Sequence, residues 1–215
     1  MTDDKKQQRD TETLILQVAE KEFLEKGYSG AKTTAIAEAA GVTHAMLHYY
    51  FRTKDKLFEK IVTDKIDKLG EILLGAVGNP GLPLKDRIRD GIESHFDFLV
   101  ANPTLPRFII NELAVHPDRI IPIRGRLLEN ASMVLAGLQA ELDRIPGVNT
   151  TAMMLLADIV SLNVFPFVAA PMLMVVAGNY FDDYDVLLEA RKQENVKTIL
   201  TKLNLISNSH KLADT

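Results

Sequence analysis

The chain has 215 residues, of which 47% are hydrophobic and 25% are charged, and its formal net charge is −4. This composition is typical of a globular protein with a buried core, and it excludes a uniformly cationic nucleic-acid binder. The absence of cysteine excludes disulfides, thiolate metal sites and a cysteine nucleophile. The first ten residues, MTDDKKQQRD, lack the apolar segment of a signal peptide, so we expect a cytoplasmic protein.

Apolar residues recur at helical spacing along almost the whole chain, and sustained strand alternation is absent. The pattern predicts an all-α fold of about nine helices. In chain order, these helices span residues 10–26, 34–40, 44–51, 54–77, 83–101, 102–115, 119–144, 150–177 and 185–205. Gly27 is expected to end the first helix, while Thr33 and Thr43 are expected to cap the second and third.

The second and third predicted helices are short, and the stretch AAGVT that joins them has the spacing of a helix-turn-helix. At about 100° per residue, the third helix has two different sides. One side carries Leu47, Tyr50 and Phe51, and the opposite side carries His44, Ala45, His48 and Tyr49. If the first side is core, the second is presented outward, where it would suit a DNA major groove.

The chemistry of this outward side fits DNA. Histidine and tyrosine can hydrogen-bond to base edges or phosphates, and Ala45 is small enough to contact a thymine methyl group. Helix N-termini near Thr33 and Thr43 favour phosphate, and Lys54 can reach a phosphate strand. The basic arm of Lys5, Lys6 and Arg9 is either a phosphate contact or a solvated tail. Residues 1–60 hold ten basic and ten acidic residues, so affinity must depend on their placement.

Residues 23–58, FLEKGYSGAKTTAIAEAAGVTHAMLHYYFRTKDKLF, resemble the DNA-binding region of the TetR/AcrR family of bacterial repressors. The shared elements are the Gly-Tyr pair, Ile-Ala, Ala-Gly-Val-Thr, the aromatic run that ends in phenylalanine, and Thr-Lys-Asp-x-Leu. The resemblance covers about residues 10–60. Beyond it, only length and the all-helical pattern agree.

The resemblance implies a homodimer that binds a palindromic operator and is released by a small effector. The family's DNA contacts map onto Thr33, Thr43, His44, Ala45, His48, Tyr49, Tyr50 and Lys54. His48 replaces the usual tyrosine and Ala45 a common glycine, so the operator sequence is not predicted. For Tyr50, family position indicates a phosphate contact, whereas its place on the helix indicates core packing.

We expect a DNA-binding domain at residues 1–57, an effector-binding and dimerisation domain at 58–206, and a flexible tail at 207–215. The second domain is rich in phenylalanine and methionine, which suits either core packing or a pocket for an apolar effector. We assign Phe108, Glu112 and Phe165 to such a pocket, where Pro166 could kink its helix. The last two long helices, 150–177 and 185–205, are the expected dimer interface.

Residues 152–176 have the length of a membrane span, but two polar residues and two prolines within them predict a buried helix or helix pair. His44 with His48, and Glu112 with His116, have the i, i+4 spacing of metal ligands. The histidine pair lacks a third ligand nearby, while Pro117 places His116 at a frayed helix end and no HExxH-type sequence is present. No catalytic motif is present. We therefore expect no enzyme, metal or cofactor. The alternatives are a ligand-blind regulator of the same fold and, less favoured, a small-molecule or metal enzyme on a helical bundle.

Overall fold

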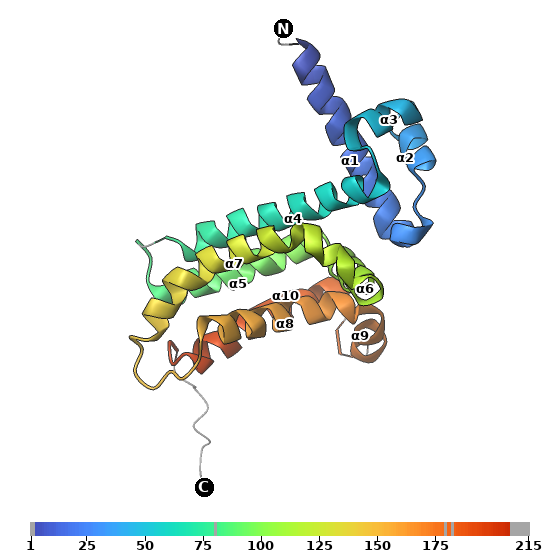
Figure 1. Ribbon diagram of the computed structural model, residues 1–215. Helices are drawn as coiled ribbons and strands as arrows, with labels where there is room; N and C mark the ends of the chain where they lie inside the picture. The colour runs from blue at the N-terminus through green and yellow to red at the C-terminus, as the bar shows by residue number, and fades with distance from the viewer. Residues whose placement is uncertain (1–2, 80, 179, 182, 207–215) are drawn as a thin grey trace. The chain divides into compact units, whose positions relative to one another are not determined.

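The computed structural model describes residues 3–79, 81–178, 180–181 and 183–206. This part of the chain contains ten α-helices, one short 3₁₀ helix and no strand, which confirms the all-α prediction (Figure 1). The predicted tail at 207–215 lies outside the described residues. The helices are α1 (Asp3–Gly30), α2 (Thr33–Ala39), α3 (His44–Phe51), α4 (Lys54–Val77), α5 (Leu84–Ala101), α6 (Leu105–Val115), η1 (Pro117–Ile120), α7 (Ile121–Leu142), α8 (Ala152–Val168), α9 (Ala170–Ala177) and α10 (Tyr184–Lys202).

The chain divides into two compact units. The first consists of residues up to 67 together with 108–127, and the second of residues 68–107 together with those from 128 onward. Helix α4 runs without a break through the expected domain limit at residues 57 and 58, so that limit remains a prediction.

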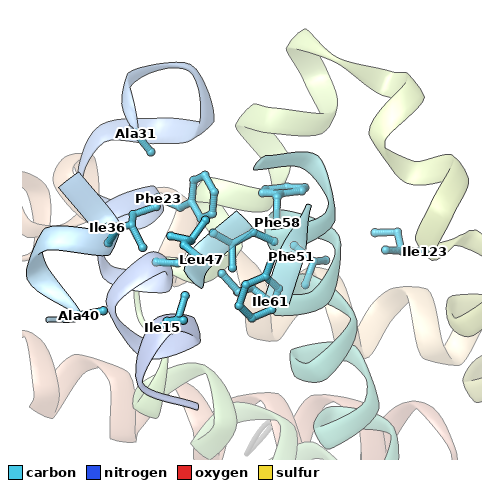
Figure 2. Close-up of a cluster of buried hydrophobic side chains, with 14 residues drawn as sticks. Ile15, Phe23, Ala31, Ile36, Ala40, Leu47, Phe51, Phe58, Ile61 and Ile123 are labelled. Carbon is cyan, nitrogen blue, oxygen red and sulfur yellow. The ribbon is translucent and has the colours of Figure 1, made fainter. Parts of the chain in front are cut away.

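The core of the first unit is formed by α1, the helices α2 and α3 of the helix-turn-helix, the first turns of α4, and Ile123 (Figure 2). Along α1, Ile15, Ala19 and Phe23 recur every four residues and are almost completely buried. Helix α1 begins well before residue 10, because its polar first turns contain good helix formers that carry no apolar pattern. At Gly27 the backbone leaves the helical conformation (φ 70°, ψ 169°), a region that favours glycine, so the expected stop is confirmed as a kink within α1.

The turn between α2 and α3 is held by local hydrogen bonds. Gly41 has a positive φ of 66°, and the N–H of Val42 donates to the carbonyl of Ala37 at 3.0 Å. Thr43 caps α3, as predicted, because its Oγ1 accepts from the N–H of Met46 at 3.2 Å. The predicted cap at Thr33 is wrong. The chain is still extended at Lys32, which takes the capping position without a side-chain bond, so Thr33 is already the first residue of α2.

In the second unit, α5, α8 and α10 pack against one another in pairs. Their aliphatic side chains form a second core with residues of α7, and Arg87 of α5 is paired with Glu141 of α7. The start of α6 was predicted at residue 102 and lies at Leu105. Asn102 instead ends α5, and its amide donates to the carbonyl of Phe98 at 2.7 Å.

The helix predicted over 150–177 is two helices in the structure, so the described chain has ten α-helices and not the nine that were predicted. Helix α8 continues past Pro166 and ends at Val168, and α9 follows after a bend of 75°. Pro171 is the second residue of α9, where the missing N–H and fixed φ of proline suit a helix start but interrupt a continuous helix. Within the described residues no single helix is long and apolar enough to cross a membrane, although this bent pair passes by length and composition alone.

Candidate nucleic-acid interface

Helix α3 has one buried and one exposed side, and the two sides divide as the sequence indicated. Leu47 and Phe51 are buried, with 3% and 6% of their surface exposed. The opposite side is exposed and carries His44, Ala45, His48 and Tyr49, of which Tyr49 keeps 67% of its surface. Met46 is exposed beside them and was not singled out from the sequence, because a methionine in an aromatic run more often belongs to a core.

The N-termini of α2 and α3 are linked by side chains. Oγ1 of Thr33 lies 3.0 Å from Nε2 of His44, and both groups are exposed. A hydroxyl can donate or accept, so this contact holds the imidazole in place in either tautomer. The Thr33–His44 pair therefore fixes one predicted contact residue against another.

Tyr50 is half-buried and lies between the two sides of α3. Its ring packs edge-on against Tyr49 at 5.6 Å and lies 6.2 Å from the ring of Phe51. The packing interpretation of Tyr50 is thus supported by its position, while a phosphate contact through its hydroxyl remains a prediction.

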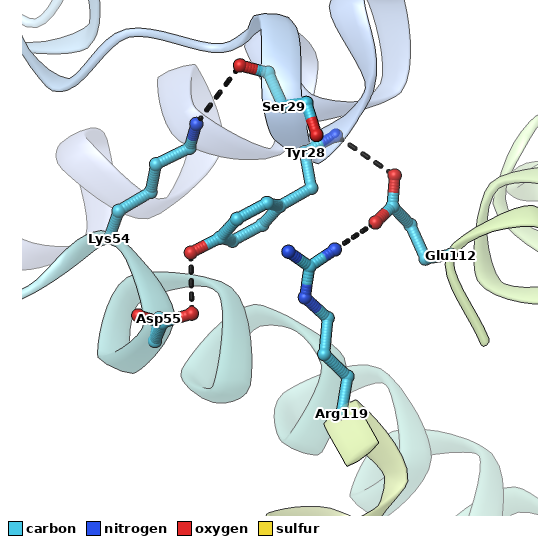
Figure 3. A network of polar contacts seen from close by, with 6 residues as sticks. All are labelled: Tyr28, Ser29, Lys54, Asp55, Glu112 and Arg119. Carbon is cyan, nitrogen blue, oxygen red and sulfur yellow. Dashed lines mark hydrogen bonds and ion pairs between the residues drawn. The ribbon is translucent and has the colours of Figure 1, made fainter. Parts of the chain in front are cut away.

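Lys54, at the start of α4, reaches back toward the end of α1. Its Nζ lies 3.5 Å from the carbonyl oxygen of Ser29 and 4.5 Å from the centroid of the Tyr28 ring (Figure 3). Burial, followed by the positive charge of Arg119, lowers the pKa of Lys54. A phosphate contact by Lys54 would have to compete with these partners.

Sequence reasoning missed a polar network around Tyr28 in the first unit (Figure 3). The Tyr28 hydroxyl donates to Oδ1 of Asp55 at 2.5 Å, and the Arg119 guanidinium lies 3.5 Å from the centroid of the ring. Glu112 accepts the Tyr28 N–H at 3.0 Å and pairs with Arg119. Burial and the hydrogen bond to Asp55 raise the pKa of Tyr28 to about 12. Tyr28 and Asp55 lie far from Glu112 and Arg119 in the sequence, and no short-range pattern connects the two pairs.

The three residues assigned to an effector pocket are not brought together within one unit. Phe108 packs its ring 5.8 Å from that of Phe58, and Glu112 belongs to the network around Tyr28, both in the first unit. Phe165 lies in the second unit, half exposed beside an open cavity of about 600 Å³ that Pro166 and Leu187 also line.

Another cavity of the second unit is enclosed by α4, α5, α7 and α8. Its volume is about 40 Å³, and His95 is the one polar side chain among the eleven residues that line it.

No metal site is supported by the arrangement of side chains. The described residues include no group of three or more His, Asp or Glu side chains placed to hold an ion.

Comparison with known proteins agrees with this geometry. The family model described as "Bacterial regulatory proteins, tetR family" matches residues 15–61, which contain the helix-turn-helix. The regulator YdgC of Bacillus subtilis is 29% identical over 134 residues, covering 60% of this chain and 69% of YdgC. The repressor BepR of Brucella suis is 31% identical over 134 residues, covering 59% of this chain and 62% of BepR.

Solved structures extend the similarity to most of the chain. The TetR-family regulator PfmR from Thermus thermophilus has a TM-score of 0.64 at 16% identity, covering 85% of this chain and 97% of PfmR. The regulator FadR from Bacillus halodurans has a TM-score of 0.63 at 18% identity, covering 86% of this chain and 93% of FadR. At these identities the likeness shows the fold alone.

The fold, the exposed face of α3 and the named relatives define a helix-turn-helix transcriptional regulator that binds DNA, not an enzyme. Residues 15–61 match the DNA-binding domain of the TetR family of bacterial regulatory proteins, and the chain is similar to regulators beyond that domain.

Proposed function

We propose that the protein is a cytoplasmic repressor, which binds a palindromic operator as a homodimer and releases it when a small apolar effector occupies the second unit. The observation that carries the DNA part is the division of α3 into a buried side and an exposed side. The exposed side presents imidazole, phenol and methyl groups in a row, as a reading helix in the major groove requires. BepR, a relative at 31% identity, is named a repressor.

The apolar surface of α8 and α9 supports a homodimer. Helix α8 exposes Met153, Met154, Val160 and Phe165, and α9 exposes Met172, Met174, Val175 and Val176. Many large apolar side chains exposed on two successive helices are expected to be buried against a partner, and a two-fold axis lets one surface cover its own copy. We place the dimer interface on these two helices and α10. A dimer would set two copies of α3 roughly 34 Å apart, one turn of DNA.

The cavity enclosed by α4, α5, α7 and α8 supports an effector site. Its walls are aliphatic apart from His95, and ligand sites of helical proteins commonly form between packed helices. An effector can shift operator affinity only by binding the DNA-competent and the released states differently. The effect is reciprocal, so operator DNA should weaken effector binding by the same factor.

The test uses purified full-length protein and a fluorescent duplex from the DNA upstream of its own gene. Anisotropy should give saturable binding that a scrambled duplex does not compete away and that weakens as salt rises. A library of neutral and anionic apolar compounds is then titrated into the complex. Release by any of them supports the repressor mechanism. A stable complex throughout would favour the ligand-blind regulator, and absence of specific binding would contradict the proposal.

A further inference from the structure

We propose that the enclosed cavity of the second unit selects small, uncharged, mainly apolar molecules that carry one hydrogen-bond acceptor, which Nε2–H of His95 holds. The inference rests on the proposed effector site and specifies the chemistry of its ligand.

The cavity presents a single polar group. Leu73 and Val77 of α4, Ile92 of α5, Leu138 of α7 and Leu155 of α8 contribute aliphatic walls. His95 lies among them with only 4% of its surface exposed. Such walls bind apolar groups by removing them from water, and they offer nothing to neutralise a charge.

The hydrogen bonds around His95 fix its tautomer. The Asn163 amide lies 3.0 Å from the carbonyl oxygen of Ile92, and a carbonyl only accepts, so the atom facing it is the nitrogen Nδ2. Asn195 donates to the other amide atom, Oδ1, at 2.9 Å, which agrees with that orientation. The second hydrogen of Nδ2 is then available for Nδ1 of His95, 3.3 Å away.

Because Nδ1 accepts, the proton of the neutral imidazole is on Nε2. Among the described residues, Nε2 has no hydrogen-bond partner, although the ring lines the cavity. The cavity therefore offers one N–H donor and no side-chain acceptor. A ketone, ester, ether or hydroxyl oxygen satisfies this donor, whereas a pure hydrocarbon leaves it unpaired.

Charge selection follows from burial. Desolvation lowers the pKa of His95 to about 4, so the ring is neutral at pH 7 and supplies no cation for a carboxylate. A cationic ligand would meet only the N–H donor and aliphatic walls, and neither stabilises a positive charge. The volume of about 40 Å³ admits only a few waters, so a ligand binds by displacing wall side chains, which keeps the preferred molecules small.

The experiment uses full-length protein without DNA and three probes of similar shape. Acetophenone carries the acceptor, α-methylstyrene replaces its C=O by C=CH₂, and benzoate carries a negative charge. Calorimetric titration should show acetophenone binding about 2- to 12-fold more tightly than α-methylstyrene, the range for one net hydrogen bond. Benzoate should bind most weakly.

Two variants assign the preference to His95. The change His95→Leu should remove the difference between acetophenone and α-methylstyrene, and His95→Gln, whose amide can donate from a similar position, should restore part of it. A readout on unmodified protein avoids any folding defect: in ¹⁵N-labelled protein, acetophenone should move the Nε2–H proton resonance of His95 further downfield than α-methylstyrene does, because only acetophenone accepts a hydrogen bond from it.

Equal or weaker binding of acetophenone, preference for benzoate, or failure of all three probes would overturn the inference. Operator binding is measured separately by anisotropy. If acetophenone binds through His95 but leaves the operator complex intact, the ligand chemistry stands and the release mechanism fails. If compounds whose binding is unchanged in His95→Leu release the operator, the release mechanism stands and the ligand chemistry fails.

Discussion

Oε1 of Glu112 accepts a hydrogen bond from the backbone N–H of Tyr28 at 3.0 Å, although the two residues are 84 positions apart. The N–H is free for this contact because α1 breaks at Gly27, immediately before it. The carboxylate also pairs with Arg119, whose guanidinium covers the Tyr28 ring. The relationship ties the segment 108–127 to the helix-turn-helix within the first unit.

Removing this carboxylate should destabilise the first unit. The change Glu112→Ala leaves the Tyr28 N–H and the Arg119 cation without their acceptor, and we expect a loss of about 1–3 kcal/mol in the free energy of unfolding. Urea denaturation followed by circular dichroism measures it. The exposed Glu38→Ala should change stability by no more than about 0.5 kcal/mol. Equal effects of the two changes would show that the contact contributes nothing.

The two threonines at helix starts should behave differently. Thr43→Ala removes the cap of α3 and should cost about 1 kcal/mol. Thr33→Ala removes only an exposed contact to His44, since Lys32 occupies the capping position of α2, and should cost clearly less. Denaturant midpoints of the two variants give the comparison, and a larger loss for Thr33→Ala would contradict the assignment of the caps.

Stability should fall in mild acid because of His95. Its pKa is about 4 in the folded protein and near 6.5 in the unfolded chain, so below pH 6.5 the unfolded state binds the extra proton. The contribution of the neutral, buried His95 ring to the free energy of unfolding is complete above pH 6.5 and is lost as pH falls toward 4. Between pH 7 and 5 this group alone should remove about 2 kcal/mol.

Urea unfolding at fixed protein concentration, compared between the native chain and His95→Gln, isolates this contribution from other carboxyl and histidine groups. The variant should show a shallower pH dependence over the same window. Identical slopes would mean that His95 is not desolvated as described.

The dimer interface can be tested with matched charges. Val160→Asp places a carboxylate on the exposed apolar side of α8 and should lower the dimer fraction in sedimentation velocity at micromolar concentration. Val100→Asp puts the same charge on an exposed site of α5 and should leave the dimer intact. An undiminished dimer in Val160→Asp would place the interface elsewhere.

Local features were readable from the sequence. The helical spacing of apolar residues over 10–26 predicts the first helix, in which Ile15, Ala19 and Phe23 are buried whereas Leu14 is exposed, and the opposite sides of α3 follow from helical geometry. Thr33 shows the limit of such reasoning. Threonine before a helical run predicts a cap, but only the backbone conformation at Lys32 decides where the helix begins.

The features that depend on tertiary packing were not predictable. From the sequence we assign Glu112 to an effector pocket, whereas its carboxylate binds the N–H of Tyr28. Nothing near Glu112 in the sequence identifies Tyr28 as its partner. His95 drew no attention, because a lone histidine on an amphipathic helix has no distinguishing pattern. Its partner Asn163 lies 68 residues away, and only the packing of α5 against α8 brings them together.

The central claim, that the exposed side of α3 reads DNA, is tested most directly by operator affinity in paired variants. Tyr49→Ala and His48→Ala should each weaken binding to the native upstream duplex about tenfold or more, the effect of losing a specific base or phosphate contact. Tyr180→Ala and His116→Ala remove the same side-chain types from exposed sites outside α3 and should leave affinity unchanged. Unchanged affinity in both α3 variants, with the fold intact by circular dichroism, would contradict the account.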